Sequence, residues 1–484
     1  MESIRIRRGA ALVAVLLLGA GAPPPPVPTG DRLASGLRDL HYGLYSRAER
    51  SFLDAARSAP DDPQSHLFLA FNYWWHLSID EDRNAHLNRP FDRAIAATLA
   101  AGQRRLERAP QDLSALTAVG SAHILRSHVE ARRRRYFRAA REARRGRKRL
   151  IRVLARDPGR LDAQFTLGAF NYYADRVPLL VKGLRAILFL PGGDADLGLR
   201  QLRAVAESGS RFRTDARILL AVICGSREER CYEGALGHLR RALADNPGSP
   251  LIRGLLAELQ MRLGHYDEAA REIERAIADA DGDSEDRARQ RAILKVALAE
   301  ALVAGWRLRE GERVLGAVEA HLEALPPSAL RRRARVRREL DEKRGAATAG
   351  EVGSPAWAPL IDAALEHARG GRPGEAIAAL NAAAAADPES PIPRFLKGRT
   401  LLRTGRAREA IAELEPLERS RADPPEWMQG WIEIYLGLAH RELGRPRAAR
   451  SRFRRAGEVR RFRSADRGLL ELRAGEPEDA RCAP

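Results

Sequence analysis

The sequence predicts an all-α protein built as a right-handed α-solenoid of antiparallel helix pairs, and three observations support this prediction. Ala, Leu, Arg and Glu dominate the 484 residues while aromatic residues make up only 6%, a composition that favours helices. Small residues recur at a spacing of 34, as Ala235 and Ala269 and again as Ala376 and Ala410. Prolines follow several repeats, where a helix ends because proline cannot continue the hydrogen-bond ladder.

The clearest repeats carry the same residue types at matching positions. The repeat from Pro250 to Asp283 has Leu256, Ala257, Leu263, Gly264, Tyr266, Ala269, Ile273 and Ala276, and the last has Leu436, Gly437, Leu443, Gly444, Ala449, Phe453 and Ala456. This pattern resembles the tetratricopeptide-repeat family. The resemblance implies two antiparallel helices in each repeat and a scaffold that binds other molecules. It does not indicate which molecules, because one fold serves many unrelated functions.

The N-terminal segment has the order of a bacterial signal peptide. Arginines at 5, 7 and 8 precede a short apolar run from Ala10 to Leu18, and Ala20-Gly21-Ala22 fits a cleavage site. We expect residues 1–22 to be a signal peptide, residues 23–30 to be a proline-rich spacer, and the protein to be exported to the periplasm or cell envelope.

The rest of the chain divides at a charged, glycine-containing stretch. We expect an N-terminal repeat array with insertions over residues 31–330, a charged helix and Gly/Ala linker over 331–355, a C-terminal array over 356–476 and a tail over 477–484. One insertion, residues 177–191, is apolar except at Lys182, Gly183 and Arg185. It is either a buried helix that plugs the array or a helix that docks on a membrane surface or a partner groove.

Positive charge is the second strong feature of the composition. The 83 Lys and Arg residues exceed the 64 Asp and Glu residues, which gives a net charge of +19. The densest basic patch comprises Arg132, Arg133, Arg134, Arg135, Arg144 and Arg145, with Tyr136 and Phe137 interleaved. It fits either a nucleic acid or phosphate surface, or a solvated helix that keeps the repeat soluble. We favour the solvated helix and do not expect nucleic acid as the partner.

Aromatic residues gather in the first helices of two expected repeats. The concave face of such arrays is lined by these helices. At the positions that point into it stand Leu67, Phe71, Trp74, Trp75, Phe165, Tyr172 and Tyr173. Aromatic anchors often supply most of the binding energy of an interface. These side chains therefore form either a binding groove or the packing of two enlarged helix pairs.

Motifs of catalysis and metal binding are missing from the sequence. No P-loop, H-E-x-x-H or G-x-S-x-G motif occurs, so we expect neither an enzyme nor a cofactor or metal site. Cys224 and Cys231 flank a connecting loop, and we expect them to form a disulfide if the protein is exported.

Two functional hypotheses follow from these features. The first is a non-catalytic scaffold of the bacterial cell envelope that binds a protein segment or an envelope component through its concave face. The alternative is a cytoplasmic or membrane-associated scaffold whose Arg-rich face binds anionic lipid or nucleic acid.

Overall fold

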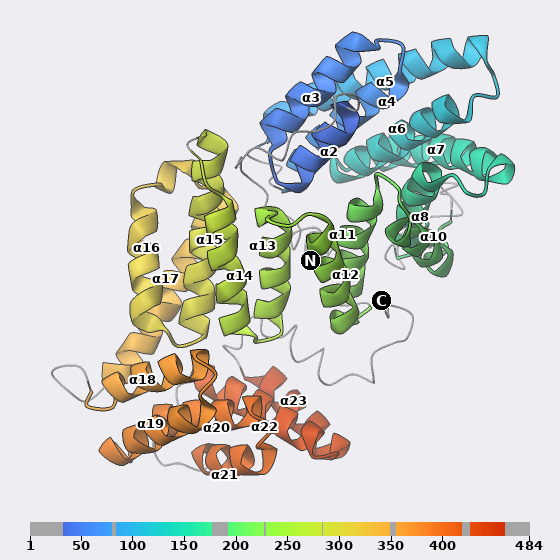
Figure 1. Ribbon diagram of the computed structural model, residues 1–484. Helices are drawn as coiled ribbons and strands as arrows, with labels where there is room; N and C mark the ends of the chain where they lie inside the picture. Colours follow the sequence, from blue (N-terminus) through green and yellow to red (C-terminus); the bar gives the residue numbers. More distant parts are fainter. Residues whose placement is uncertain are drawn as a thin grey trace.

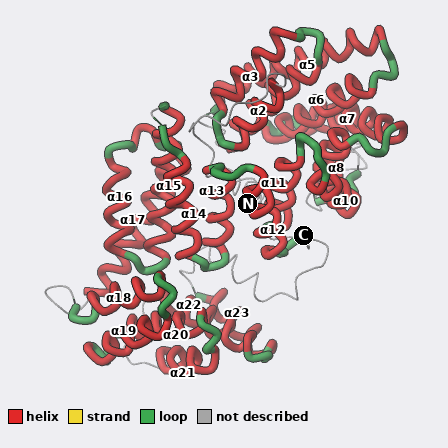
Figure 2. Tube along the Cα trace, viewed as in Figure 1, coloured by secondary structure: helices red, strands yellow, loops and turns green. Residues whose placement is uncertain are grey.

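The computed structural model describes residues 32–79, 84–176, 192–226, 229–282, 284–348, 355–418 and 426–459. Within these ranges every regular element is a helix and there is no strand, so the predicted all-α solenoid is confirmed (Figures 1 and 2). The expected signal peptide, the proline-rich spacer, the insertion at 177–191 and the C-terminal tail lie outside the described residues.

Seven helix pairs make up the described N-terminal array, and each pair packs along its length. They are α2 (Arg32–His41) with α3 (Tyr45–Ser58), α4 (Pro63–Ile79) with α5 (Asn88–Arg108), α6 (Leu113–Arg132) with α7 (Tyr136–Arg156), α8 (Leu161–Asp175) with α10 (Ala195–Glu207), α11 (Arg213–Cys224) with α12 (Tyr232–Asp245), α13 (Pro250–Arg262) with α14 (Tyr266–Asp279), and α15 (Glu285–Ala304) with α16 (Leu308–Glu319).

Three further pairs form the described C-terminal array. They are α18 (Ala358–Arg369) with α19 (Pro373–Ala386), α20 (Pro391–Arg403) with α21 (Ala407–Glu418), and α22 (Glu426–Glu442) with α23 (Pro446–Glu458). The long helix α17 (Pro327–Thr348) stands between the arrays, and the short 3-10 helices η1 (Ala85–Leu87) and η2 (Leu322–Ala324) precede α5 and α17 (Figure 1).

The turn inside most pairs is three residues long, and its middle residue has a left-handed backbone. In five turns this residue is a glycine with φ between 67° and 78°: Gly43, Gly264, Gly371, Gly405 and Gly444. Glycine adopts this conformation without the steric penalty that a Cβ atom brings. Arg134 and Trp306 hold the same place in the α6–α7 and α15–α16 turns, with φ of 60° and 69°.

The two helices of a pair approach closely where one of them has a glycine. A Cβ atom added to Gly437 would lie 2.4 Å from Cε1 of Phe453, and one added to Gly36 would lie 2.4 Å from Cε1 of Phe52. In both pairs the large ring follows the glycine by 16 positions. The missing side chain therefore makes room for a fully buried ring on the second helix.

The first repeat contacts helices far along the chain. Nε2 of His41 lies 3.1 Å from Oδ2 of Asp215 on α11, and the Ser249 hydroxyl before α13 donates a hydrogen bond of 2.7 Å to the His41 carbonyl. The Tyr42 hydroxyl donates to the Pro247 carbonyl at 2.6 Å. The end of α2 is thus held against the α12–α13 turn, and one continuous core runs from Leu37 to Leu263 (Figure 1).

Helix α17 contains the charged segment that the sequence places between the arrays. Val336 and Leu340 are fully buried against α15 and α16. Arg332 is buried as well, forming an ion pair with Glu300 and contacting Glu258 at 2.9 Å. The described part of the segment, up to Thr348, is therefore packed structure continuous with the N-terminal array, and residues 349–354 of the expected linker lie outside the described residues.

The C-terminal array is joined to the preceding helices by both apolar and charged contacts. Trp306, in the α15–α16 turn, lies in the same buried cluster as Trp357. Arg403 on α20 forms ion pairs with Asp267 and Glu268 on α14. Burial opposes ionisation of Asp267, but Arg399 and Arg403 hold its pKa below the usual value.

The close approach of α22 and α23 gives a first prediction. Replacing Gly437 with Ala should destabilise the C-terminal array by about 1–3 kcal/mol, because the added methyl overlaps the Phe453 ring. The matched control is Gly316→Ala in α16, where the new Cβ would meet no neighbouring atom. That change should stabilise the protein by roughly 0.5–1 kcal/mol, since alanine is the better helix former. Denaturant unfolding of both variants measures this, and equal stabilities would contradict the close-packing account.

Candidate functional site

The predicted aromatic groove is largely closed in the structure. Leu67, Phe71, Trp75 and Tyr172 are buried, with exposed fractions between 3% and 9%. Of the remaining three predicted residues, Trp74 and Phe165 are partly buried, and Tyr173 is 47% exposed. Most of the seven side chains therefore pack within the helix pairs, as in the second of the two interpretations, and Tyr173 is the one that is largely exposed.

A loop residue accounts for part of this closure. Phe212, which precedes α11, stacks on Phe165 of α8 at 5.0 Å between ring centroids and on Phe68 of α4 at 5.6 Å. The Tyr172 hydroxyl donates to Glu229 at 3.0 Å, and burial and this carboxylate both raise the pKa of Tyr172. Neither Phe68 nor Phe212 is among the residues predicted for the groove. Phe212 lies in a turn, outside the helix positions that a repeat pattern marks.

The disulfide expected of the exported protein, between Cys224 and Cys231, is not present in this structure. Both cysteines are buried, with exposed fractions of 1% and 2%. Instead the Cys231 amide donates a hydrogen bond of 2.9 Å to the Cys224 carbonyl, and this bond closes the connecting loop. Both side chains belong to the N-terminal core cluster, where cysteine packs as a small apolar residue.

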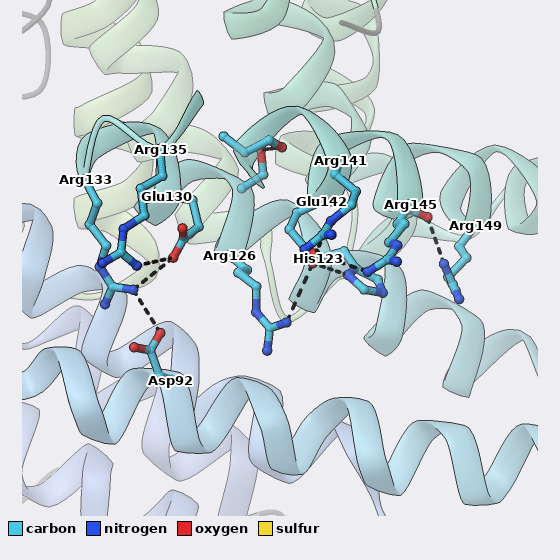
Figure 3. Close-up of polar contacts among 12 residues, drawn as sticks. Asp92, His123, Arg126, Glu130, Arg133, Arg135, Arg141, Glu142, Arg145 and Arg149 are labelled. Carbon is cyan, nitrogen blue, oxygen red and sulfur yellow. Dashed lines mark hydrogen bonds and ion pairs between the residues drawn. The ribbon is translucent and has the colours of Figure 1, made fainter. Parts of the chain in front are cut away.

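The predicted basic patch divides into inward and outward residues. Arg132 donates to the Leu77 carbonyl of α4 at 2.9 Å, and Arg133 contacts Asp92 of α5 at 3.2 Å and Glu130 at 3.1 Å (Figure 3). These two arginines therefore hold the α6–α7 turn against the preceding repeat. The other four predicted residues, Arg134, Arg135, Arg144 and Arg145, are exposed to solvent.

A buried carboxylate lies beneath the basic residues of α7. Glu142 Oε2 lies 2.6 Å from Nδ1 of His123 on α6, and Glu142 Oε1 lies 3.3 Å from Arg145 (Figure 3). Burial alone would raise the pKa of Glu142, but His123, Arg126 and Arg145 keep it below the usual value. Glu142 thus joins α7 to α6 through an ionised, hydrogen-bonded contact.

The outward side of α7 carries far more positive charge than Glu142 can balance. Glu142 is the only acidic residue of this 21-residue helix, which has nine basic residues. Five exposed cations follow steps of three and four residues, and this spacing puts them in one row along the helix: Arg138, Arg141, Arg145, Lys148 and Arg152. We call the row of these five cations the basic α7 face. Beside it, burial and then repulsion by Arg145 lower the pKa of Arg149.

Apolar side chains accompany the basic α7 face. Among the described residues, five large apolar side chains are exposed, and three of them lie on α7: Tyr136 at 56%, Phe137 at 75% and Ile151 at 41%. Single exposed apolar residues are ordinary. Three on one helix that is otherwise strongly cationic mark a surface suited to contact with another molecule.

Arg134 gives independent support to this surface. It occupies the turn position that is glycine in five other pairs, and it adopts φ of 60° there. A residue with a Cβ atom in this conformation costs about 1–2 kcal/mol relative to its relaxed backbone. Backbone strain that the fold does not require is concentrated at functional sites. The chain carries an exposed cation where a glycine would fit without strain.

Two further classes of site find no support in the described ranges. No group of three or more His, Cys, Asp or Glu side chains there is arranged to hold a metal ion. None of the helices described is both long enough and apolar enough to cross a bilayer.

Comparison with known proteins identifies the repeats. Residues 227–294 and 368–429 match the family model of the tetratricopeptide repeat. The first segment contains α12, α13, α14 and the first half of α15, and the second contains α19, α20 and α21. No curated protein sequence matches the chain.

Among solved structures, a tetratricopeptide repeat protein from Parabacteroides merdae is 14% identical, with 64% of this chain and 99% of that chain covered and a TM-score of 0.23. The human IFIT1 dimer with m7Gppp-AAAA is 14% identical, with 94% and 80% covered and a TM-score of 0.28. The TPR2AB domain of yeast Sti1 in a pHSP90 complex is 14% identical, with 54% and 99% covered and a TM-score of 0.24. Likenesses at this level carry no information about the ligand of this chain.

The strained turn generates a prediction about stability. Replacing Arg134 with Gly should leave the protein at least as stable, with a gain of up to about 1 kcal/mol, because the left-handed strain is removed. Replacing Trp306 with Gly at the equivalent turn should instead destabilise it by about 3–5 kcal/mol, since that side chain is only 4% exposed. Thermal melting compares the two, and a marked loss for Arg134→Gly would show that Arg134 has a structural role.

Proposed function

We propose that this chain, which contains tetratricopeptide repeats, is a non-catalytic interaction scaffold that binds an anionic partner through the basic α7 face. The observation that carries the proposal is the row of five exposed cations on α7 whose only acidic neighbour on that helix, Glu142, is buried and already bonded to His123. Glu142 contacts Arg145 at 3.3 Å and Arg141 at 3.9 Å, so a single carboxylate faces five cations. The row therefore keeps an excess of positive charge, which attracts anions from solution.

The basic α7 face is preferred to the concave aromatic groove as the site of binding. Four of the seven groove residues are buried, so they cannot meet a partner without opening the core. The outward cations of α7 are exposed and need no rearrangement. A preformed surface binds at lower conformational cost than one that must first be opened.

The binding proposal predicts a localised effect of charge reversal. The triple variant Arg138→Glu, Lys148→Glu, Arg152→Glu changes exposed residues of α7. It should weaken binding to heparin and to poly-L-glutamate at least tenfold, by an amount that shrinks as salt is added. The measurement is calorimetric titration at several salt concentrations.

The matched control reverses three exposed arginines of α23. Arg447→Glu, Arg450→Glu, Arg454→Glu lowers the net charge of the protein by the same amount at a different place. Its affinity for both polyanions should stay within about twofold of the wild type, because screening confines such effects to roughly 10 Å. Equal losses in both variants would show that overall charge governs binding and that the α7 face has no special role.

We also propose that the protein acts outside the cytoplasm, in a bacterial cell envelope. The order of basic, apolar and small residues in positions 1–22 supports this. N-terminal sequencing of the protein isolated from its own cells should find Pro23 as the first residue, in an extracytoplasmic fraction. An intact Met1 on protein from the cytoplasmic fraction would refute export and leave the binding proposal untouched.

A further inference from the structure

We infer that the anionic partner of the basic α7 face is the headgroup surface of a phospholipid bilayer. This inference rests on the proposed function, because it names the partner of the same site. The protein would lie on the membrane through α7, with Phe137 and Ile151 entering the boundary between headgroups and acyl chains.

The shape of the face suits a flat partner. Helix α7 has 21 residues and is therefore about 30 Å long. Arg138, Arg145 and Arg152 are separated by seven positions each, so they lie along one nearly straight line on its outward side. A straight row of cations on the outside of a helix can meet many phosphates at once on a plane. Each such cation strengthens the attraction to an anionic bilayer.

The placement of the apolar residues also fits a bilayer. Phe137 and Ile151 are separated by 14 positions, so they share one side of α7 and lie about 21 Å apart. Arg144 stands midway between them, and Arg141 and Lys148 fill the gaps. Long cationic side chains can reach the phosphates while the apolar residues at both ends enter deeper.

A nucleic acid fits this arrangement less well. Proteins that bind single strands place aromatic rings along the track, where successive bases stack on them. On α7 the exposed rings, Tyr136 and Phe137, are confined to one end, and the other end has Ile151, which offers no aromatic face. The midsection is cationic only.

A partner protein also fits less well. Specific protein interfaces have an apolar centre and a polar rim. Here the order is reversed, because the cations Arg141, Arg145 and Lys148 form the centre and the apolar residues lie at the ends. A layer of lipid headgroups imposes no such order, since apolar insertion and phosphate contact are available at every point.

Vesicle binding by the full chain tests the inference. The wild type should sediment with vesicles of equal phosphatidylglycerol and phosphatidylcholine, and should not sediment with pure phosphatidylcholine. Arg138→Glu, Lys148→Glu, Arg152→Glu should reduce the partition coefficient on the order of a hundredfold. The α23 triple variant should behave as the wild type.

A second pair of variants separates insertion from simple charge attraction. Phe137→Ser, Ile151→Ser should reduce the partition coefficient about tenfold or more, because two apolar insertions are lost. The same variant should bind heparin and poly-L-glutamate as the wild type does. The control, Leu330→Ser, removes an exposed apolar residue of α17 and should have no effect on either.

The outcomes test the lipid inference separately from the proposed binding of an anionic partner, on which it rests. Binding to heparin and poly-L-glutamate without binding to phosphatidylglycerol vesicles would overturn the lipid inference and leave the proposed function standing. Failure to bind any of these polyanions would overturn both. Tighter binding of a single-stranded oligonucleotide than of the vesicles, with loss on changing Phe137, would replace the lipid with nucleic acid.

Discussion

The whole array depends on how closely the two helices of one repeat approach. Gly36, Gly398 and Gly437 each face a bulky side chain on the following helix, and a Cβ atom at any of them would lie only 2.4–2.5 Å from that side chain. The approach fixes the separation and tilt of the pair, and every later pair is stacked on the surface that results. Small errors in one pair would therefore accumulate along the solenoid. The second constraint is the reversal of the chain between the two helices, which left-handed turn residues such as Gly264 and Gly444 make possible.

These constraints are local, which is why the fold could be predicted from the sequence. A glycine and a ring 16 positions later, or a glycine within a three-residue turn, both recur with the repeat. The periodic pattern therefore reports helix pairing directly. The charged helix before the second array was predicted from its charge and the glycines after it, and the structure begins that helix at Pro327 and packs Val336 against its neighbours.

The candidate site was harder to predict from the sequence, because it depends on which side chains are buried and on contacts between residues that are distant in the chain. Arg133 and Arg134 are neighbours in the sequence, yet one is held by Asp92 and the other points to solvent from a strained backbone. Because both are arginines, their residue type could not predict which of them is exposed. Phe212 closes the space between α4 and α8 from a turn, and a repeat pattern has no position for it. The burial of Tyr172 likewise involves a distant residue, Glu229, which accepts a hydrogen bond from its hydroxyl.

The contact of His41 with Asp215 and Ser249 changes how this array should come apart. In a solenoid whose repeats touch only their neighbours, the ends fray first and the chain loosens stepwise. Here the first repeat is tied to helices α11 and α13, so releasing it breaks two sets of contacts at once. The helices between them contribute to the same core, except that α7 packs in a smaller cluster with α6 and α8. The segment from α2 to α13 therefore unfolds as a single cooperative block, whereas α23 packs chiefly on α22 at the end of the described array and opens more easily.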